Sequence, residues 1–120
     1  MNMDAGKPKI VKKAWGQELW MANNQAENYC GKILTIDKGY KSSMHFHLSK
    51  HETFYVLKGS LAVHLFNLSE GEPLETVVVN EGETYELDRV TAHQLEALEQ
   101  LELIEISTFH RDEDSYRIHR

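Results

Sequence analysis

The chain has 120 residues and a formal net charge of −6, and 41% of its residues are hydrophobic. These values indicate one soluble globular domain spanning 1–120, in which residues 1–9 are expected to be flexible. The acidic balance argues against nucleic acid as the main partner, because phosphate binding needs a basic face. No segment has the roughly 20 apolar residues of a membrane span, so no membrane partner is expected.

A single cysteine, Cys30, excludes an intrachain disulfide and fits a reducing, cytoplasmic location. Because no nearby base is evident in the sequence, we expect Cys30 to be a buried structural thiol rather than a nucleophile. The N-terminus has no apolar stretch of signal-peptide length, which agrees with the same location.

In chain order, the first predicted element is an extended arm over 10–21 that contains Trp15 and Trp20. This arm is expected either to contact a second copy or to cap its own domain. Short strands follow, separated by polar or glycine-containing turns, at 29–36, 41–48, 52–57, 60–66, 75–79 and 82–87. The tail from 108 onward is charged, and its residues 115–118 are expected to dock on the domain. Many short strands without an internal repeat are typical of an all-β barrel or double-sheet jelly roll.

Two histidines in the second of these strands are separated by a single residue. On a strand, His45 and His47 therefore face one cavity, and Phe46 faces away from it. The same alternation places Lys41 and Ser43 on the cavity side, so these two residues are candidate substrate-binding groups. A histidine pair of this kind can also face a polar groove and bind no metal.

Two further residues extend the histidine pair to a possible ligand set. Glu52 follows a short polar connection, and the next strand can run back antiparallel and carry it near the two imidazoles. His93, farther along the chain, is the best candidate for a fourth ligand. Imidazole nitrogens together with a carboxylate oxygen suit one divalent transition metal, and Zn, Mn, Fe, Ni and Co all remain possible.

The spacing of these residues resembles the first motif of the cupin family. That motif is glycine, five residues, HxH, three or four residues, glutamate, six residues and glycine. Its positions correspond here to Gly39, His45, His47, Glu52 and Gly59. The resemblance implies a small double-stranded β-helix, or jelly-roll barrel, that holds a metal and a small-molecule ligand. A homodimer is also expected, because a second copy often covers the edge strands of such barrels.

The second cupin motif is only partly present. Gly82 and His93 match it at the family spacing. Asp88 replaces the family's proline, Val90 its second glycine and Ala97 its terminal asparagine. These departures affect the turn and the asparagine, whereas the histidine ligand is retained.

Residues 92–105 contain many Leu, Glu, Ala and Gln residues, which favour a helix when the segment is considered in isolation. The cupin resemblance instead implies strands at 93–98 and 101–107, and we predict strands. The apolar run at Leu103, Ile104 and Ile106 indicates a second strand that is buried on both faces.

Segments outside the motifs resemble the cupin domain of type II mannose-6-phosphate isomerases. The similarity lies around Trp15 and Tyr29, and in the closing segment that ends at Arg117. It implies metal-assisted aldose–ketose isomerisation of a sugar or sugar phosphate. The alternatives are an iron-dependent cupin dioxygenase and a non-enzymatic barrel that binds a small carbohydrate.

The isomerase hypothesis requires a general base and, for a sugar phosphate, a cationic partner. The sequence does not select either residue. Candidate bases are Lys41, Tyr55, Tyr85 and His51, and candidate phosphate partners are Lys41, Arg89 and Arg117.

Overall fold

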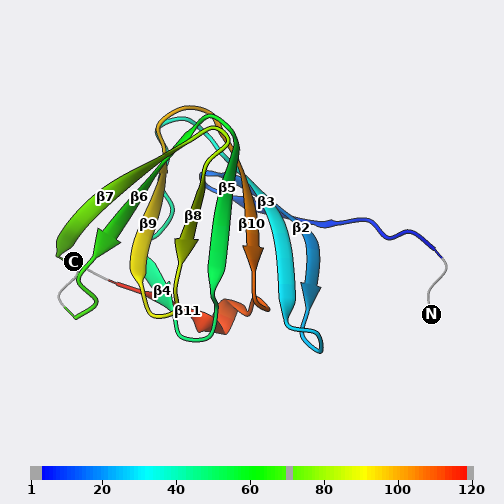
Figure 1. Ribbon diagram of the computed structural model, residues 1–120. Helices are drawn as coiled ribbons and strands as arrows, with labels where there is room; N and C mark the ends of the chain where they lie inside the picture. The colour runs from blue at the N-terminus through cyan, green and yellow to red at the C-terminus, as the bar shows by residue number, and fades with distance from the viewer. Residues whose placement is uncertain (1–3, 70–71, 119–120) are drawn as a thin grey trace.

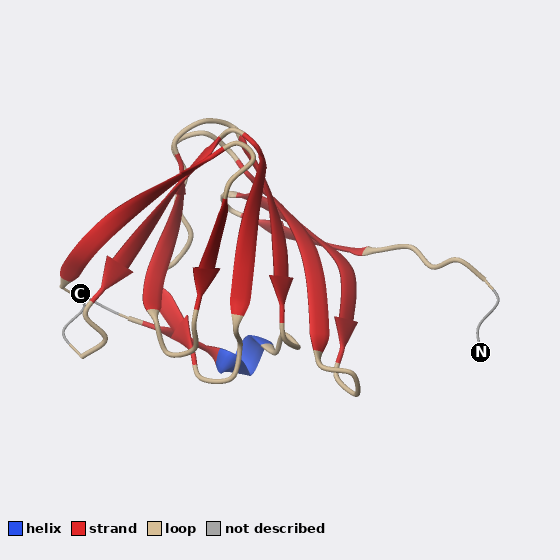
Figure 2. Cartoon of the chain, viewed as in Figure 1, coloured by secondary structure: helices blue, strands red, loops and turns tan. Residues whose placement is uncertain are grey.

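The computed structural model describes residues 4–69 and 72–118, and these form an almost entirely β structure (Figure 2). Residues 1–3 of the predicted flexible segment lie outside the described residues. The elements are β1 (Lys9–Lys13), β2 (Gly16–Asn24), β3 (Tyr29–Ile36), β4 (His45–His47), β5 (Glu52–Lys58), β6 (Ser60–Phe66), β7 (Pro73–Asn80), β8 (Thr84–Leu87), β9 (Ala92–Ala97), β10 (Leu101–Ser107), the 3₁₀ turn η1 (Asp112–Asp114) and β11 (Ser115–Arg117).

The strands form two antiparallel sheets that face each other. One has the order β1-β2-β3-β10-β5-β8 and the other the order β11-β4-β9-β6-β7. The sheets converge at the end that carries the β5–β6, β7–β8 and β9–β10 turns, and they separate at the end where β4, β11 and η1 lie (Figure 1). The prediction of an all-β jelly-roll barrel is confirmed. No helix among the described residues is long and apolar enough to cross a membrane.

The ambiguous segment at 92–105 forms strands β9 and β10, as predicted. Burial alternates along both, because β10 lies between β3 and β5, and β9 lies between β4 and β6. The hydrogen bonds and packing of these neighbours override the helix propensity of the sequence. The expectation that β10 is buried on both faces is wrong, because Ile106 is 61% exposed on the outer face.

The apolar core occupies the end where the sheets converge. Alternate residues of β3, β5, β6 and β10 point inward there, so their side chains meet between the sheets. The cluster comprises Leu34, Ile36, Phe54, Val56, Leu61, Val63, Val79, Leu87, Leu95, Ala97, Leu101 and Leu103. Trp15 packs against this cluster, and Trp20 makes an edge contact with the ring of His110. Both tryptophans of the N-terminal arm therefore contact their own barrel. Cys30 is buried and forms no disulfide.

Gly59, which forms the β5–β6 turn, is required by both its backbone conformation and its neighbours. Its φ is +92°, and a Cβ at this position would lie 2.2 Å from the carbonyl oxygen of Gln100. Any other residue would therefore be strained and would also force the β9–β10 turn to move.

We expect Gly59→Ala to lower the free energy of unfolding by more than about 1 kcal/mol, measured by urea denaturation. Gly31→Ala is the matched control, because its nearest neighbour would be the Met21 side chain at 3.8 Å and its φ is not in the left-handed region. Equal stability of the two variants would contradict this account of the turn.

Candidate metal centre

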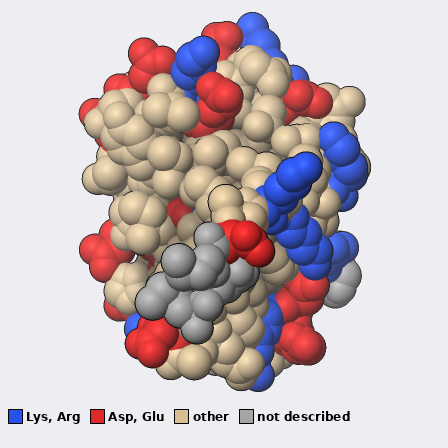
Figure 3. Space-filling model, turned by 90° about the vertical axis from the view of Figure 1, so that its right-hand side faces the viewer, with Lys and Arg blue, Asp and Glu red and all other residues tan. Residues whose placement is uncertain are grey.

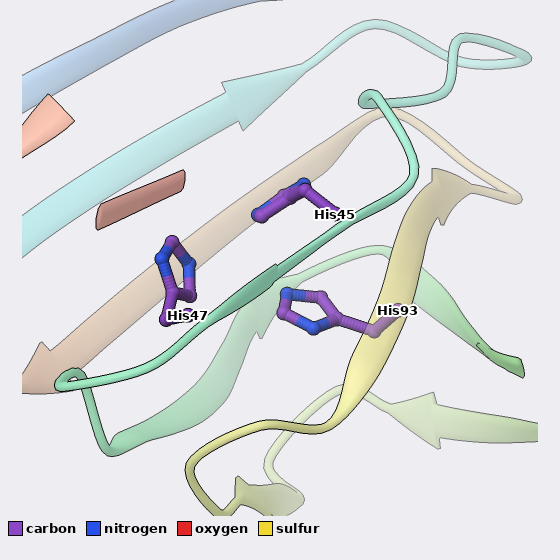
Figure 4. Close-up of side chains that lie close together, drawn as sticks. All are labelled: His45, His47 and His93. Carbon is purple, nitrogen blue, oxygen red and sulfur yellow. The ribbon is translucent and has the colours of Figure 1, made fainter. Parts of the chain in front are cut away.

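Three histidines from two neighbouring strands converge on one point inside the barrel (Figure 4). His45 and His47 lie on β4, and His93 lies opposite His45 on β9. One ring nitrogen from each histidine lies within 4.8 Å of the others. The prediction that His45 and His47 face the same cavity is confirmed, and Phe46 instead stacks on Tyr116 at 5.3 Å between ring centroids.

A backbone carbonyl holds the Nδ1 atom of each of these rings. A carbonyl oxygen can only accept a hydrogen bond, so each Nδ1 carries a hydrogen and donates the hydrogen bond. The Nε2 lone pair of each ring is then free for a metal, which is how histidine ligands are commonly oriented. The acceptors are the carbonyls of Ser43 for His45 (3.0 Å), Asp114 for His47 (3.1 Å) and Thr91 for His93 (2.8 Å).

Burial keeps the three rings neutral. Burial, which is the larger cause, and the neighbouring histidines together lower the pKa of each ring to about 4. A neutral imidazole is the form that binds metals, so at pH 7 no proton has to leave these three rings before an ion can bind. The donor set and its protonation state thus fit a divalent transition metal.

Glu52 lies beside two of the three rings. Its Oε2 is 3.6 Å from Nε2 of His47 and 3.5 Å from Nε2 of His93. Burial and the nearby Glu105 carboxylate raise the pKa of Glu52 above its ordinary value, and the Lys50 ammonium opposes this rise only in part. A bound cation would favour the ionised form of this carboxyl group.

A network of buried charges next to Glu52 was not predicted from the sequence. The Lys50 ammonium contacts Glu105 at 2.6 Å and Glu52 at 3.6 Å, and it lies 3.0 Å from Nδ1 of His110. Burial raises the pKa of Glu105, but the charges of Lys50 and Lys32 and the hydrogen bonds from Lys50 and Ser107 together outweigh burial and hold this pKa below the ordinary value. Sequence reasoning placed Lys50 in a polar, turn-prone connection, yet only 3% of this residue is exposed.

A second buried pair lies on the wall formed by β2 and β3. The Lys32 ammonium is 3.2 Å from Glu18 and 4.2 Å from the centre of the Trp20 ring. Alternation along the strand would have revealed Lys32, because it falls between the buried Cys30 and Leu34 on the inward face.

A cavity of about 510 Å³ opens onto the three histidines. Ser43 lines it, so its predicted position on the cavity side is confirmed, while its role in binding a substrate stays a prediction. Lys41 does not line it and instead borders a smaller pocket beside His64. The predicted strand at 41–48 is interrupted, since Lys41 makes only an isolated bridge to Glu96 and β4 begins at His45. The alternation that would have turned Lys41 inward is therefore lost.

The candidate bases and phosphate partners from the sequence also differ in whether they line the cavity. Arg117 lines the cavity, whereas Arg89 and the four candidate bases do not. Arg89 contacts the carbonyl of Ser49 and the ring of His51 on the outer surface. The cavity also contains several groups that sequence reasoning missed, notably Lys32, Lys50, Glu105 and His110.

Comparison with known families agrees with this geometry. The family profile described as the cupin domain matches residues 32–107. The chain belongs to the cupin family. The match contains every histidine of the cluster and Glu52, whereas β1, β2 and β11 of this cupin lie outside it. No protein of curated function matches the chain.

Solved structures share the fold. KdgF from Halomonas sp. is 23% identical, with a TM-score of 0.66 and 81% of each chain covered. An RmlC-like cupin from Shewanella frigidimarina is 18% identical, with a TM-score of 0.71, and the alignment covers 88% of this chain and 87% of that chain. Oxalate decarboxylase from Bacillus subtilis is 16% identical, with a TM-score of 0.75, and the alignment covers 92% of this chain but only 30% of that chain.

We expect the double variant His45→Ala, His47→Ala to lose its metal while keeping its fold, because the apolar core lies at the opposite end of the barrel. Elemental analysis by plasma mass spectrometry should find about one transition metal per wild-type chain and none in the variant. His64→Ala, which removes a histidine outside the cluster, is the control. Stoichiometric metal in the double variant would mean that the ion binds elsewhere.

Proposed function

We propose that this cupin binds one divalent transition metal and interconverts an aldose and a ketose, with a sugar or sugar phosphate as substrate. The observation that carries the proposal is the convergence of three neutral imidazoles, with free Nε2 atoms, on the wall of a cavity of about 510 Å³. Cavities of this size commonly accommodate small organic ligands.

We infer that the ligands are His45, His47, His93 and Glu52. The Glu52 Oε2 atom lies 3.6 and 3.5 Å from Nε2 of His47 and His93, close to the separation of about 3.4 Å between neighbouring ligand atoms of one ion with bonds of about 2.1 Å. The donor set does not select among Zn, Mn, Fe, Ni and Co. When bound, the ion would supply Lewis-acid polarisation of a sugar oxygen.

The rest of the reaction depends on the groups around the cavity. Isomerisation moves a proton between neighbouring carbons, so a titratable side chain must reach the sugar. The four bases suggested by the sequence lie outside the cavity lining. We infer that the base is one of the titratable lining groups that are neither metal ligands nor the proposed substrate contact Arg117, namely Lys13, Glu18, Lys32, Lys50, Glu105, His110 and Asp112.

The charge inside the cavity favours an anionic ligand. Four basic side chains line it, Lys13, Lys32, Lys50 and Arg117, and four acidic ones, Glu18, Glu52, Glu105 and Asp112. These charges balance, so a divalent ion would leave the filled cavity with two positive charges. Uncompensated charge is unfavourable in a partly buried site, and an anionic substrate such as a sugar phosphate would neutralise it. We propose Arg117 and Ser43 as contacts for this substrate.

The function is tested by incubating the metal-reconstituted protein with mannose, lyxose, fructose and the corresponding sugar phosphates. We expect interconversion of one aldose–ketose pair, with the phosphate form preferred, and none with the His45→Ala, His47→Ala control. Lack of interconversion with every substrate and every metal would overturn the proposal. Oxygen consumption with Fe(II) would then support a dioxygenase, and stabilisation by a sugar without turnover would support a binding protein.

We also propose that the protein is cytoplasmic and forms a homodimer through the outer face of the larger sheet. Apolar residues form a continuous cross-strand row there, at Ile10, Leu19, Ile33, Ile104 and Tyr55. Ile106 and Met21 lie beside this row and are 61% and 49% exposed. The cytoplasmic location is inferred from the single free cysteine.

A second copy suits this face because the two edges of the sheet carry opposite charge. A two-fold axis parallel to the strands places β1 of one copy opposite β8 of the other. The exposed residues on and before β1 include Lys7, Lys9 and Lys12, and those on and before β8 include Glu81, Glu83 and Glu86. The side of the molecule that carries β2 and the N-terminal arm shows Lys and Arg side chains gathered along one flank (Figure 3).

We expect light scattering to report a dimer at micromolar chain concentration, and Ile106→Lys to weaken it at least about tenfold by burying an unpaired charge. Leu74→Lys is the matched control, since Leu74 is 65% exposed but lies on β7 in the other sheet. A monomeric wild-type protein, or equal effects of the two substitutions, would contradict this interface.

A further inference from the structure

The tail after β10 returns to the metal centre. Strand β11 pairs antiparallel with β4, so that Ser115 lies opposite His47 and Arg117 lies opposite His45. Among the described strands, β4 is the only neighbour of β11. The turn η1 and β11 thus lie at the open end of the barrel, beside the strand that carries two of the histidines (Figure 1).

Asp114, at the end of η1, makes two kinds of contact with the histidine strand. Its backbone carbonyl accepts a hydrogen bond from the Nδ1–H group of His47, with an N···O distance of 3.1 Å. Its carboxylate accepts hydrogen bonds from three successive backbone N–H groups, those of Leu48 (3.0 Å), Ser49 (3.2 Å) and Lys50 (3.2 Å). Only 3% of Asp114 is exposed.

These N–H groups belong to the connection between His47 and Glu52. Successive N–H groups that point to one side form a concave anion site, and here the carboxylate fills it. The side chain of Asp114 therefore fixes the connection that separates two of the proposed ligands. At the same time, its main chain fixes the orientation of one imidazole. Both contacts come from outside the region 32–107 that matches the family.

We propose that Asp114 is a positioning residue of the metal centre, and that the tail from Arg111 to Ile118 is part of that centre. This inference rests on the metal binding in the proposed function and does not depend on isomerisation. Both carboxylate oxygens are used, Oδ1 by Leu48 and Ser49, and Oδ2 by Ser49 and Lys50. An amide in place of the carboxylate would direct an NH₂ group at one of these N–H donors.

The test is Asp114→Asn, with Co²⁺ as the probe ion. We expect Co²⁺ affinity to fall about 10- to 100-fold, as it does when groups that orient metal ligands are lost. We also expect the visible absorption of bound Co²⁺ to change, because the angles between its ligands change. Glu113→Gln, which alters the exposed neighbouring carboxylate, should match the wild-type protein in both measurements.

A second control separates positioning from general stability. Val79→Ala removes volume from the buried core at the other end of the barrel and should destabilise the protein without changing Co²⁺ affinity or spectrum. If Asp114→Asn leaves both measurements unchanged, or Val79→Ala changes them equally, the inference is overturned. If the wild-type protein binds Co²⁺ but isomerises no sugar, the isomerase function fails while this inference stands. If the wild-type protein binds no metal, both fail.

Discussion

Three imidazole rings can present their Nε2 atoms to one ion only if something holds each ring by its other nitrogen. In this cupin each Nδ1–H donates a hydrogen bond to a backbone carbonyl, which cannot itself donate one, so the carbonyls fix both the ring orientation and the tautomer. The carbonyls of Ser43 and Thr91 lie two residues from the histidines that they hold. The third comes from the C-terminal tail, so a local motif is completed by a distant segment.

The interior of the barrel is apolar at one end and charged at the other. Where the sheets converge, alternate aliphatic side chains fill the space and exclude water. Toward the open end the inward positions carry Lys32, Lys50, Glu52 and Glu105 instead. Buried charges are tolerated only when they are paired and hydrogen-bonded, and these lysines meet carboxylates at 3.2 and 2.6 Å. The apolar end thus stabilises the fold, whereas the charged end lines the cavity.

Much of this arrangement was predictable from the sequence, because strand alternation and motif spacing are local properties. The fold and the shared direction of His45 and His47 followed from them, whereas the strands at 92–105 were predicted from the cupin resemblance and against the helix propensity of the segment. Lys41 was misplaced because alternation holds only along an unbroken strand, and the strand begins at His45. The burial of Lys50 and the contacts of Asp114 depend on which distant segments meet, and one sequence does not specify that.

The lining of the cavity has a consequence for how such proteins diverge. Lys13 and Trp15 line the cavity from the β1–β2 hairpin, and Asp112, Ser115 and Arg117 line it from the tail. All five lie outside the matched region 32–107, so relatives can share every motif residue and still surround their ligands with different side chains. Substitutions of these five side chains can therefore change the lining of the cavity while the three histidines and Glu52 stay the same. In this cupin the motif residues lie in the middle of the chain, and the two ends of the chain supply part of the wall around them.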